Sequence, residues 1–223
     1  MSADANADGL APALLLSFVG GYVDTFSFVT LFGLFTAHVT GNFVLIGAAL
    51  AGQGHASVLG KLLALPVFVL GVAATHAWQR SRDSAVALVV TQGIGLVAFM
   101  AAGLVLGPFA DPGVPAAIGV GLVGVAAMAV QNAAARSTFA TLSPSTVMTG
   151  NVTQVTMDLV DLLRYDPRAD ATRARVARFW PPIVAFAVGA IAAGGLAGRL
   201  GFWALMLPIL ALLALAIRLR ASP

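Results

Sequence analysis

The stretch AVALVVTQGIGLVAFMAAGLVL, residues 85–106, carries no charged side chain from end to end. At a rise of about 1.5 Å per residue, a helix of this length reaches across the ~30 Å hydrocarbon core of a bilayer. A helix on the surface of a soluble protein would show a charged or polar face, and this stretch has none. It therefore predicts a transmembrane helix.

The composition of the whole chain supports the same class. Of its 223 residues, 59% are hydrophobic and 9% are charged, whereas soluble domains have roughly 25% charged residues. The net charge of +3 comes almost entirely from arginines scattered between apolar runs, without the contiguous basic face that nucleic acid requires. The absence of cysteine excludes disulfides and thiolate metal sites. We expect neither an enzyme nor a bound cofactor.

Apolar runs like residues 85–106 recur along the chain, and together they predict one transmembrane domain. Residues 1–9 form an N-terminal tail, residues 10–217 the membrane domain and residues 218–223 a C-terminal tail. The first run is longer than the apolar core of a signal peptide, so we expect a retained helix. The predicted spans are residues 10–31, 58–78, 85–106, 116–135, 179–197 and 202–217.

Two shorter apolar pieces, residues 40–52 and 149–163, each open with Thr-Gly-Asn. Each would reach only about 20 Å as a helix, which is short of the hydrocarbon core. They are either re-entrant, which leaves six spans, or they cross, which gives eight short spans.

The distribution of basic residues distinguishes the two topologies, because cytoplasmic loops are enriched in Lys and Arg. With six spans and both termini cytoplasmic, ten basic residues lie inside and two, Lys61 and Arg199, lie outside. With eight spans the division becomes eight to four, and Arg80 and Arg82 fall on the outer side. The sequence therefore favours six spans in a bacterial cytoplasmic membrane. The ten are Arg80, Arg82, Arg136, Arg164, Arg168, Arg173, Arg175, Arg178, Arg218 and Arg220.

The order of elements occurs twice, in residues 10–106 and again in residues 116–217. Each half has a span, a polar linker, Thr-Gly-Asn, a short helix and two more spans. Three crossings per half reverse the orientation of the second half, as in the inverted repeats of transporters. The predicted fold is all-α and integral to the membrane, with six transmembrane helices in two inverted three-helix repeats.

The connection of residues 161–178 holds five Arg and three Asp. We interpret it as a solvated cytoplasmic loop with affinity for anionic lipid headgroups, and a regulatory or partner site is the alternative.

Asp24 is the costliest residue to place in a membrane, because it lies well inside the first span. A carboxylate near the bilayer centre costs about 2.5–3.5 kcal/mol on insertion scales, so we expect it to face the bundle interior or water. It is either a protonatable, solute-contacting group or a hydrogen-bonding group between helices. His38, in the following linker, is either a proton carrier or a hydrogen-bonding linker residue.

The two triplets, Thr40-Gly41-Asn42 and Thr149-Gly150-Asn151, are candidates for solute binding. At the start of a half-helix, Thr or Asn can cap free N–H groups, Gly allows close backbone approach, and the helix dipole favours an anion or polar solute. The alternative is that both are structural caps.

Other polar residues are candidates for the second half of a cavity or for contacts between helices. They are Gln131, Asn132, Gln154 and Asp158. The small-residue pairs Gly103/Gly107 and Gly194/Gly198 permit close helix approach, either in the core or in a homo-oligomer.

The residues GGYVDTFSF (20–28), AHVTGN (37–42), MAVQNAAAR (128–136) and MTGNVTQ (148–154) resemble the YoaK-like family of small bacterial membrane proteins, domain of unknown function 1275. The resemblance covers the chain after its N-terminal tail and implies interest in Asp24, Gln131, Asn132 and the two triplets. It implies no activity. The second half has Gln131 and Asn132 where the first has its acidic residue, which argues against a symmetric site.

These features predict a transporter or channel for a small polar or anionic solute, surrounded by the lipid bilayer. The alternative is a non-transporting membrane assembly or lipid-binding accessory protein.

Overall fold

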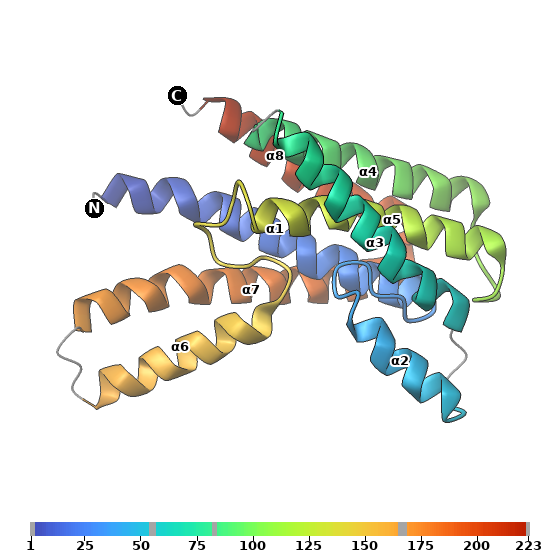
Figure 1. The fold of residues 1–223 in the computed structure, drawn as a ribbon, viewed down its shortest axis with the longest axis horizontal. Helices are drawn as coiled ribbons and strands as arrows, with labels where there is room; N and C mark the ends of the chain where they lie inside the picture. The colour runs from blue at the N-terminus through green and yellow to red at the C-terminus, as the bar shows by residue number, and fades with distance from the viewer. Residues whose placement is uncertain (1–2, 54–56, 82–83, 165–168, 222–223) are drawn as a thin grey trace.

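The computed structural model is an all-α bundle (Figure 1). It describes residues 3–53, 57–81, 84–164 and 169–221, with side chains from Gly9 onward. Within these residues there are eight α-helices, one short 3₁₀-helix and no strand. The elements are α1 (Ala3–Thr30), α2 (Gly41–Leu50), α3 (Val58–Gln79), α4 (Ala85–Leu106), α5 (Pro115–Ala135), α6 (Met148–Leu163), α7 (Ala169–Leu200), η1 (Gly201–Leu205) and α8 (Met206–Ala221).

Within the described residues, five helical stretches are long and apolar enough to cross a membrane: Gly9–Thr30, Val58–Gln79, Ala85–Leu106, Pro115–Ala135 and Ala169–Ala221. The last contains 53 residues, and a straight helix of that length would measure about 80 Å. Instead, Gly201 adopts a φ of 53° at the start of η1, and α8 turns back from α7 (Figure 1). This stretch therefore covers the last two predicted spans.

The helices extend further than the sequence suggested at two places. Helix α1 begins at Ala3, so most of the predicted N-terminal tail is helical. Helices α6 and α7 also take up most of the predicted loop 161–178, of which residues 165–168 lie outside the described part. Alanine and arginine favour helix in this region, and Asp170 lies in the first turn of α7, where a negative charge is stabilising.

The bundle is held together by close approaches between helix backbones. Helix α1 packs along α7, and α3 packs along α5. A Cβ at Gly21 of α1 would collide with the carbonyl oxygen of Phe186, and one at Gly189 of α7 would collide with that of Phe18. Such contacts allow dispersion forces to hold helices that have no hydrophobic driving force in lipid.

Aromatic rings fill the space between α1, α4 and η1. Phe26, Phe99 and Phe202 contact one another edge to face, with centroid separations of 5.4–6.0 Å. A Cβ at Gly103 would overlap the ring of Phe202, so the first small-residue pair serves packing inside the chain. The second pair, Gly194/Gly198, has no neighbour within 4 Å of the added Cβ atoms.

The two short helices leave the bundle in opposite directions. Figure 1 shows that α2 and α6 both begin near the middle of the bundle and run toward opposite ends. Helix α2 contacts α3, and α6 contacts α7. Neither short helix packs into the centre of the bundle. Each therefore leaves apolar side chains exposed, such as Val44 of α2 and Leu163 of α6.

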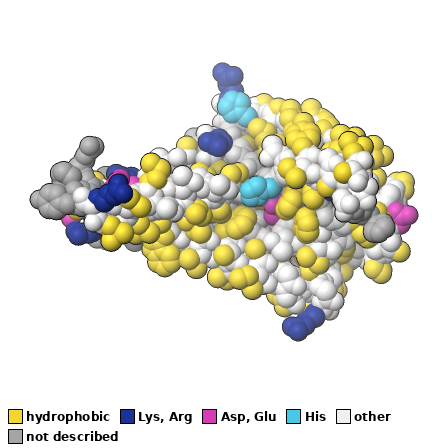
Figure 2. All heavy atoms as spheres, turned by 90° about the horizontal axis from the view of Figure 1, so that it is seen from below, with side chains coloured by type: hydrophobic (Ala, Val, Ile, Leu, Met, Phe, Trp, Pro, Cys, Tyr) yellow, Lys and Arg dark blue, Asp and Glu magenta, His cyan; other side chains and the backbone are white. Residues whose placement is uncertain are grey.

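Charge is concentrated at one end of the molecule. The chain termini lie at the same end (Figure 1), where α3, α5, α6 and α8 finish and α4 and α7 begin. The described arginines lie at this end, except for Arg199 at the last turn of α7. Figure 2 shows basic side chains at the narrow left end of one face and also at the upper and lower edges of the view, with hydrophobic side chains across the broad middle.

Candidate functional site

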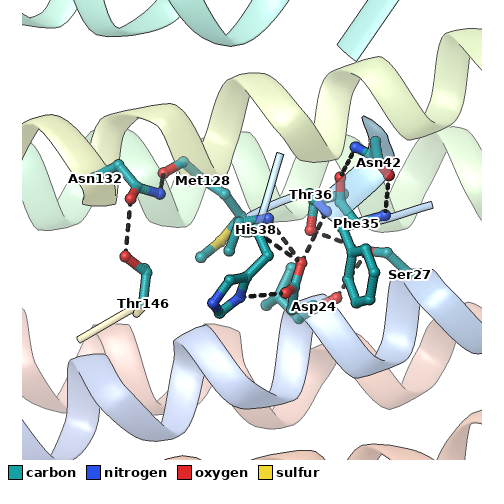
Figure 3. A network of polar contacts seen from close by, with 11 residues as sticks. Asp24, Ser27, Phe35, Thr36, His38, Asn42, Met128, Asn132 and Thr146 are labelled. Atoms are coloured by element: carbon teal, nitrogen blue, oxygen red, sulfur yellow. Dashed lines mark hydrogen bonds and ion pairs between the residues drawn. The ribbon is translucent and has the colours of Figure 1, made fainter. Parts of the chain in front are cut away.

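Asp24 fixes the linker between α1 and α2. Its side chain is almost completely buried, and Oδ1 accepts hydrogen bonds of 2.8 Å from the backbone N–H groups of Thr36 and Ala37 (Figure 3). The N–H of His38 lies 3.4 Å from the same oxygen. The buried carboxylate thus accepts hydrogen bonds from three consecutive amides of this chain.

His38 completes this arrangement through its side chain. Its Nδ1 lies 2.9 Å from Oδ2 of Asp24, and its ring lies edge-on to those of Phe35 and Phe186 at centroid distances of 6.4 and 6.2 Å. His38 belongs to the linker, outside the candidate spans, and the hydrogen bond to Asp24 raises its pKa above the ordinary value. About one third of the side chain is exposed.

The first triplet stabilises the same linker, but not through helix capping. Thr40 is the N-cap of α2 and makes no side-chain capping bond. Instead, Asn42 accepts a 3.0 Å hydrogen bond from the N–H of Phe35 and donates one of 2.9 Å to its carbonyl oxygen. A Cβ at Gly41 would lie 3.0 Å from the Phe35 ring. The triplet therefore holds the linker close to the start of α2.

The second triplet lies within the first turns of α6, where Val147 is the N-cap. Asn151 again reaches back seven residues, and its Nδ2 donates a 2.9 Å hydrogen bond to the carbonyl oxygen of Pro144. Proline has no N–H, so Pro144 cannot donate to Asn151 the hydrogen bond that the N–H of Phe35 donates to Asn42. Thr149 is exposed, and a Cβ at Gly150 would meet nothing within 4 Å. The expected close backbone approach at Gly150 is therefore wrong.

Gln131 connects three parts of the core. Its Nε2 donates to the carbonyl oxygen of Leu16 at 2.8 Å and to Oγ of Ser145 at 3.0 Å. Its Oε1 accepts a 2.6 Å hydrogen bond from Gln92. The side chain is buried and its polar atoms are bound, so Gln131 joins helices and does not line a cavity.

Asn132, the next residue, borders an open cavity at the basic end of α3 and α5. Its Oδ1 accepts a 2.8 Å hydrogen bond from Thr146, and its Nδ2 donates to the carbonyl oxygen of Met128 (Figure 3). The cavity measures about 440 Å³, within the usual range for small-molecule sites. It is lined by Phe68, Val72, His76, Asn132, Ala133, Arg136 and Ser137.

Gln154 and Asp158 face α7. Asp158 is buried, and its Oδ1 lies 2.8 Å from Nη2 of Arg175 and 3.0 Å from Nε2 of Gln154. The ion pair joins the buried carboxylate of α6 to a partly exposed guanidinium of α7, and charge-assisted hydrogen bonds of this kind are strong. These residues therefore join α6 to α7 and belong neither to the Asp24 cluster nor to the cavity at Asn132.

The structure thus divides the predicted site residues among separate places. Asp24, His38 and Asn42 surround the first linker, and Asn132 alone borders the cavity. Sequence reasoning missed the cavity residues His76 and Arg136, because their approach depends on the packing of α3 against α5. Within the described residues, no group of three His, Cys, Asp or Glu side chains is arranged to hold a metal ion.

Comparison with known proteins agrees with this membrane architecture. The family model described as "Protein of unknown function (DUF1275)" matches residues 12–218. The chain belongs to the DUF1275 family. This DUF1275 protein is also similar to the UPF0700 transmembrane protein YoaK of Bacillus subtilis (strain 168), with 31% identity over 146 residues. The match covers 65% of this chain and 64% of YoaK, so it spans less than two thirds of that relative. No solved structure matches this DUF1275 chain.

Proposed function

We propose that this protein is a transporter or channel for a small polar or anionic solute, built from two inverted repeats in the bacterial cytoplasmic membrane. The observation that carries the proposal is the cavity at Asn132. It lies where an inverted repeat would place the counterpart of the Asp24–His38 cluster.

The helix contacts support the repeat. If α1, α2, α3 and α4 are exchanged with α5, α6, α7 and α8, the contact of α1 with α7 becomes that of α5 with α3. Likewise, α2 with α3 becomes α6 with α7, and α4 with α5 becomes α8 with α1. Corresponding helices run in opposite directions along the bundle (Figure 1). This is the relation expected of an inverted repeat.

The linkers correspond at single residues. Asn42 and Asn151 each bind the residue seven positions earlier, Phe35 and Pro144. By the same register, Val147 takes the place of His38. In the first half, the His38 side chain reaches back to Asp24, whereas the valine cannot form such a bond.

The helix pairs also correspond around the two sites. Phe186 precedes Gly189 of α7 by three residues, and Phe68 precedes Gly71 of α3 by three. Gly189 packs closely on α1, and Gly71 packs on Ala129 of α5. Phe186 contacts His38, whereas Phe68 lines the cavity at Asn132. In the first half, the Phe186 ring packs against the His38 side chain, whereas the corresponding position in the second half borders the open cavity.

The lining of the cavity favours an anionic or polar solute. Arg136 presents a permanently charged guanidinium with several donors, suited to carboxylate or phosphate groups. Asn132 supplies an amide, His76 an imidazole, and Phe68 and Val72 an apolar wall. The basic end of the bundle, which carries this cavity and both termini, would face the cytoplasm.

The proposal is tested with the full-length protein in liposomes. Uptake of labelled acetate, lactate, phosphate and glycerol is compared with that of protein-free liposomes. Arg136→Gln and Asn132→Leu should reduce uptake of the transported probe at least tenfold. Arg199→Gln, an exposed charge at the other end, should not. If none of the four probes is taken up above the protein-free level, or if uptake is unchanged in both cavity variants, the proposal fails.

A further inference from the structure

Lys61 is a buried cation whose hydrogen-bonding capacity is mostly unused. Only 2% of the residue is exposed, and its ammonium group donates to the carbonyl oxygen of Phe32 at 3.2 Å. An ammonium has three N–H donors. The ion pairs in the described part of the chain are His38–Asp24, Arg173–Asp170 and Arg175–Asp158, and none includes Lys61. Residues 54–56, which precede α3 in the sequence and lie outside the described part, contain no carboxylate.

The lysine lines a small cavity at the end of the bundle opposite the chain termini. Part of the lining comes from the first turns of two helices, with Ser57 and Gly60 at the start of α3 and Ala117 and Ile118 at the start of α5. The helix dipole is positive at both of these ends. The N–H of Gly60 donates to Oγ of Ser57 and that of Ile118 to the carbonyl oxygen of Val114. Two positive helix ends and one ammonium group therefore surround the same space.

The size of the cavity limits what can bind. Its volume is about 20 Å³, and a space of roughly 10–15 Å³ on this measure holds one water molecule. A monatomic ion is nearer to this size than a carboxylate or a phosphate. An uncompensated charge in a low-dielectric environment is costly, and an anion beside the ammonium would offset part of that cost.

We propose that this cavity binds a single halide ion, fluoride or chloride, between Lys61 and the first turns of α3 and α5. The ion offsets the buried charge and holds the start of α3 against the linker at Phe32. The linker contains an unfavourable backbone conformation, because Phe32 has a φ of 55° and is not a glycine. Contacts with the start of α3 would stabilise it. The site lies at the end of the bundle opposite the cavity at Asn132 and does not depend on transport.

The test measures the melting temperature of the full-length protein in detergent, with sodium gluconate replaced stepwise by sodium fluoride or chloride at constant ionic strength. A ligand that binds the folded state raises the melting temperature in a saturable manner. We expect this rise for the wild-type protein. Lys61→Met should lose it or show at least tenfold weaker halide binding. Arg199→Gln, which removes an exposed charge at the same end, should respond as the wild-type protein does.

A second variant keeps the lysine and narrows the cavity, in case Lys61→Met does not fold. A Cβ at Gly60 would lie 3.5 Å from both Ser57 and Ile118, in ordinary contact, so Gly60→Ala should fold. Its halide affinity should fall because space is lost. Line broadening of the ³⁵Cl resonance by each protein gives an independent measure of chloride binding. A wild-type protein without a saturable halide response, or Lys61→Met and Gly60→Ala proteins that bind halide as the wild type does, would overturn the proposal.

Discussion

Asp24 and His38 form a contact of 2.9 Å between Oδ2 and Nδ1, and the other carboxylate oxygen of Asp24 binds the backbone of the same linker. The acidic residue in the first span thus has a structural partner on both oxygens. Its location explains how a carboxylate is tolerated inside a membrane helix, since it is surrounded by donors rather than lipid.

We predict that Asp24→Ala destabilises the protein much more than Asp24→Asn. Alanine leaves the buried N–H groups of Thr36 and Ala37 without an acceptor, at an expected loss of about 2–4 kcal/mol. Asparagine keeps one oxygen for these donors, so we expect a loss of about 1 kcal/mol or less. Melting temperatures in detergent compare the variants. Equal melting of Asp24→Ala and wild-type protein would show that the linker does not depend on the carboxylate.

The stability of the protein should also depend on the protonation of His38. Its pKa is raised in the folded protein, first by the hydrogen bond to Asp24, so protonation stabilises the fold. This contribution is fully present below the ordinary histidine pKa of about 6.5, and it is lost as the pH rises through the higher folded-state pKa.

Melting temperatures measured from pH 6 to pH 9 test this dependence. The wild-type protein should lose stability over this range, and His38→Gln should show a flatter profile. His76→Gln is the control, because His76 lines the cavity at Asn132 and does not belong to the Asp24 cluster. If His38→Gln and the wild-type protein follow the same slope, the contact does not contribute.

Sequence reasoning identified residues whose placement in a membrane has an evident free-energy cost, or whose motif is repeated. Asp24 was identified because a mid-span carboxylate requires partners, and Asn42 and Asn151 because the same triplet occurs twice. What the sequence could not predict was the partner of each side chain. The hydrogen bond from Asn42 to Phe35 depends on how the linker folds back, which no residue spacing specifies.

For Lys61, the sequence did not predict that the side chain is buried. On sequence it was an orientation signal at the outer end of a span, because interfacial lysines usually extend toward water. Its burial results from the packing of α3 and α5 around the linker at Phe32. Likewise, the cavity at Asn132 is lined by residues of α3 and of the end of α5, which the sequence alone does not bring together.

Topology is tested with single cysteines, because the natural chain contains none. Ser81, Gly113 and Ala171 are exposed, and Gly113 lies at the opposite end of the bundle from the other two. With both termini cytoplasmic, Ser81→Cys and Ala171→Cys should resist an impermeant thiol reagent in intact cells, and Gly113→Cys should react. Labelling of Ser81→Cys from outside would favour the eight-span alternative.

The ion pair between Asp158 and Arg175 should contribute to the docking of α6 on α7. Asp158→Ala removes the buried carboxylate that binds Arg175, and because the arginine side chain is 44% exposed, we expect a loss of about 1 kcal/mol. Asp170→Ala is a matched control, because its pair with Arg173 is fully exposed and such pairs contribute little. Limited proteolysis between α6 and α7 and melting temperature should separate the two variants. Equal behaviour would show that other contacts hold α6 in place.

The two glycines of the repeated triplets should respond differently to the same substitution. At Gly41, a Cβ would lie 3.0 and 3.3 Å from atoms of the Phe35 ring, and Phe35 carries both hydrogen bonds to Asn42. Gly41→Val should therefore cost about 1–3 kcal/mol through overpacking. At Gly150, a Cβ meets no atom within 4 Å, and valine is no worse than glycine in a helix, so Gly150→Val should change stability by less than about 0.5 kcal/mol. Melting temperatures measured side by side decide this, and equal destabilisation by both valines would mean that α6 packs more closely at Gly150 than the present structure allows.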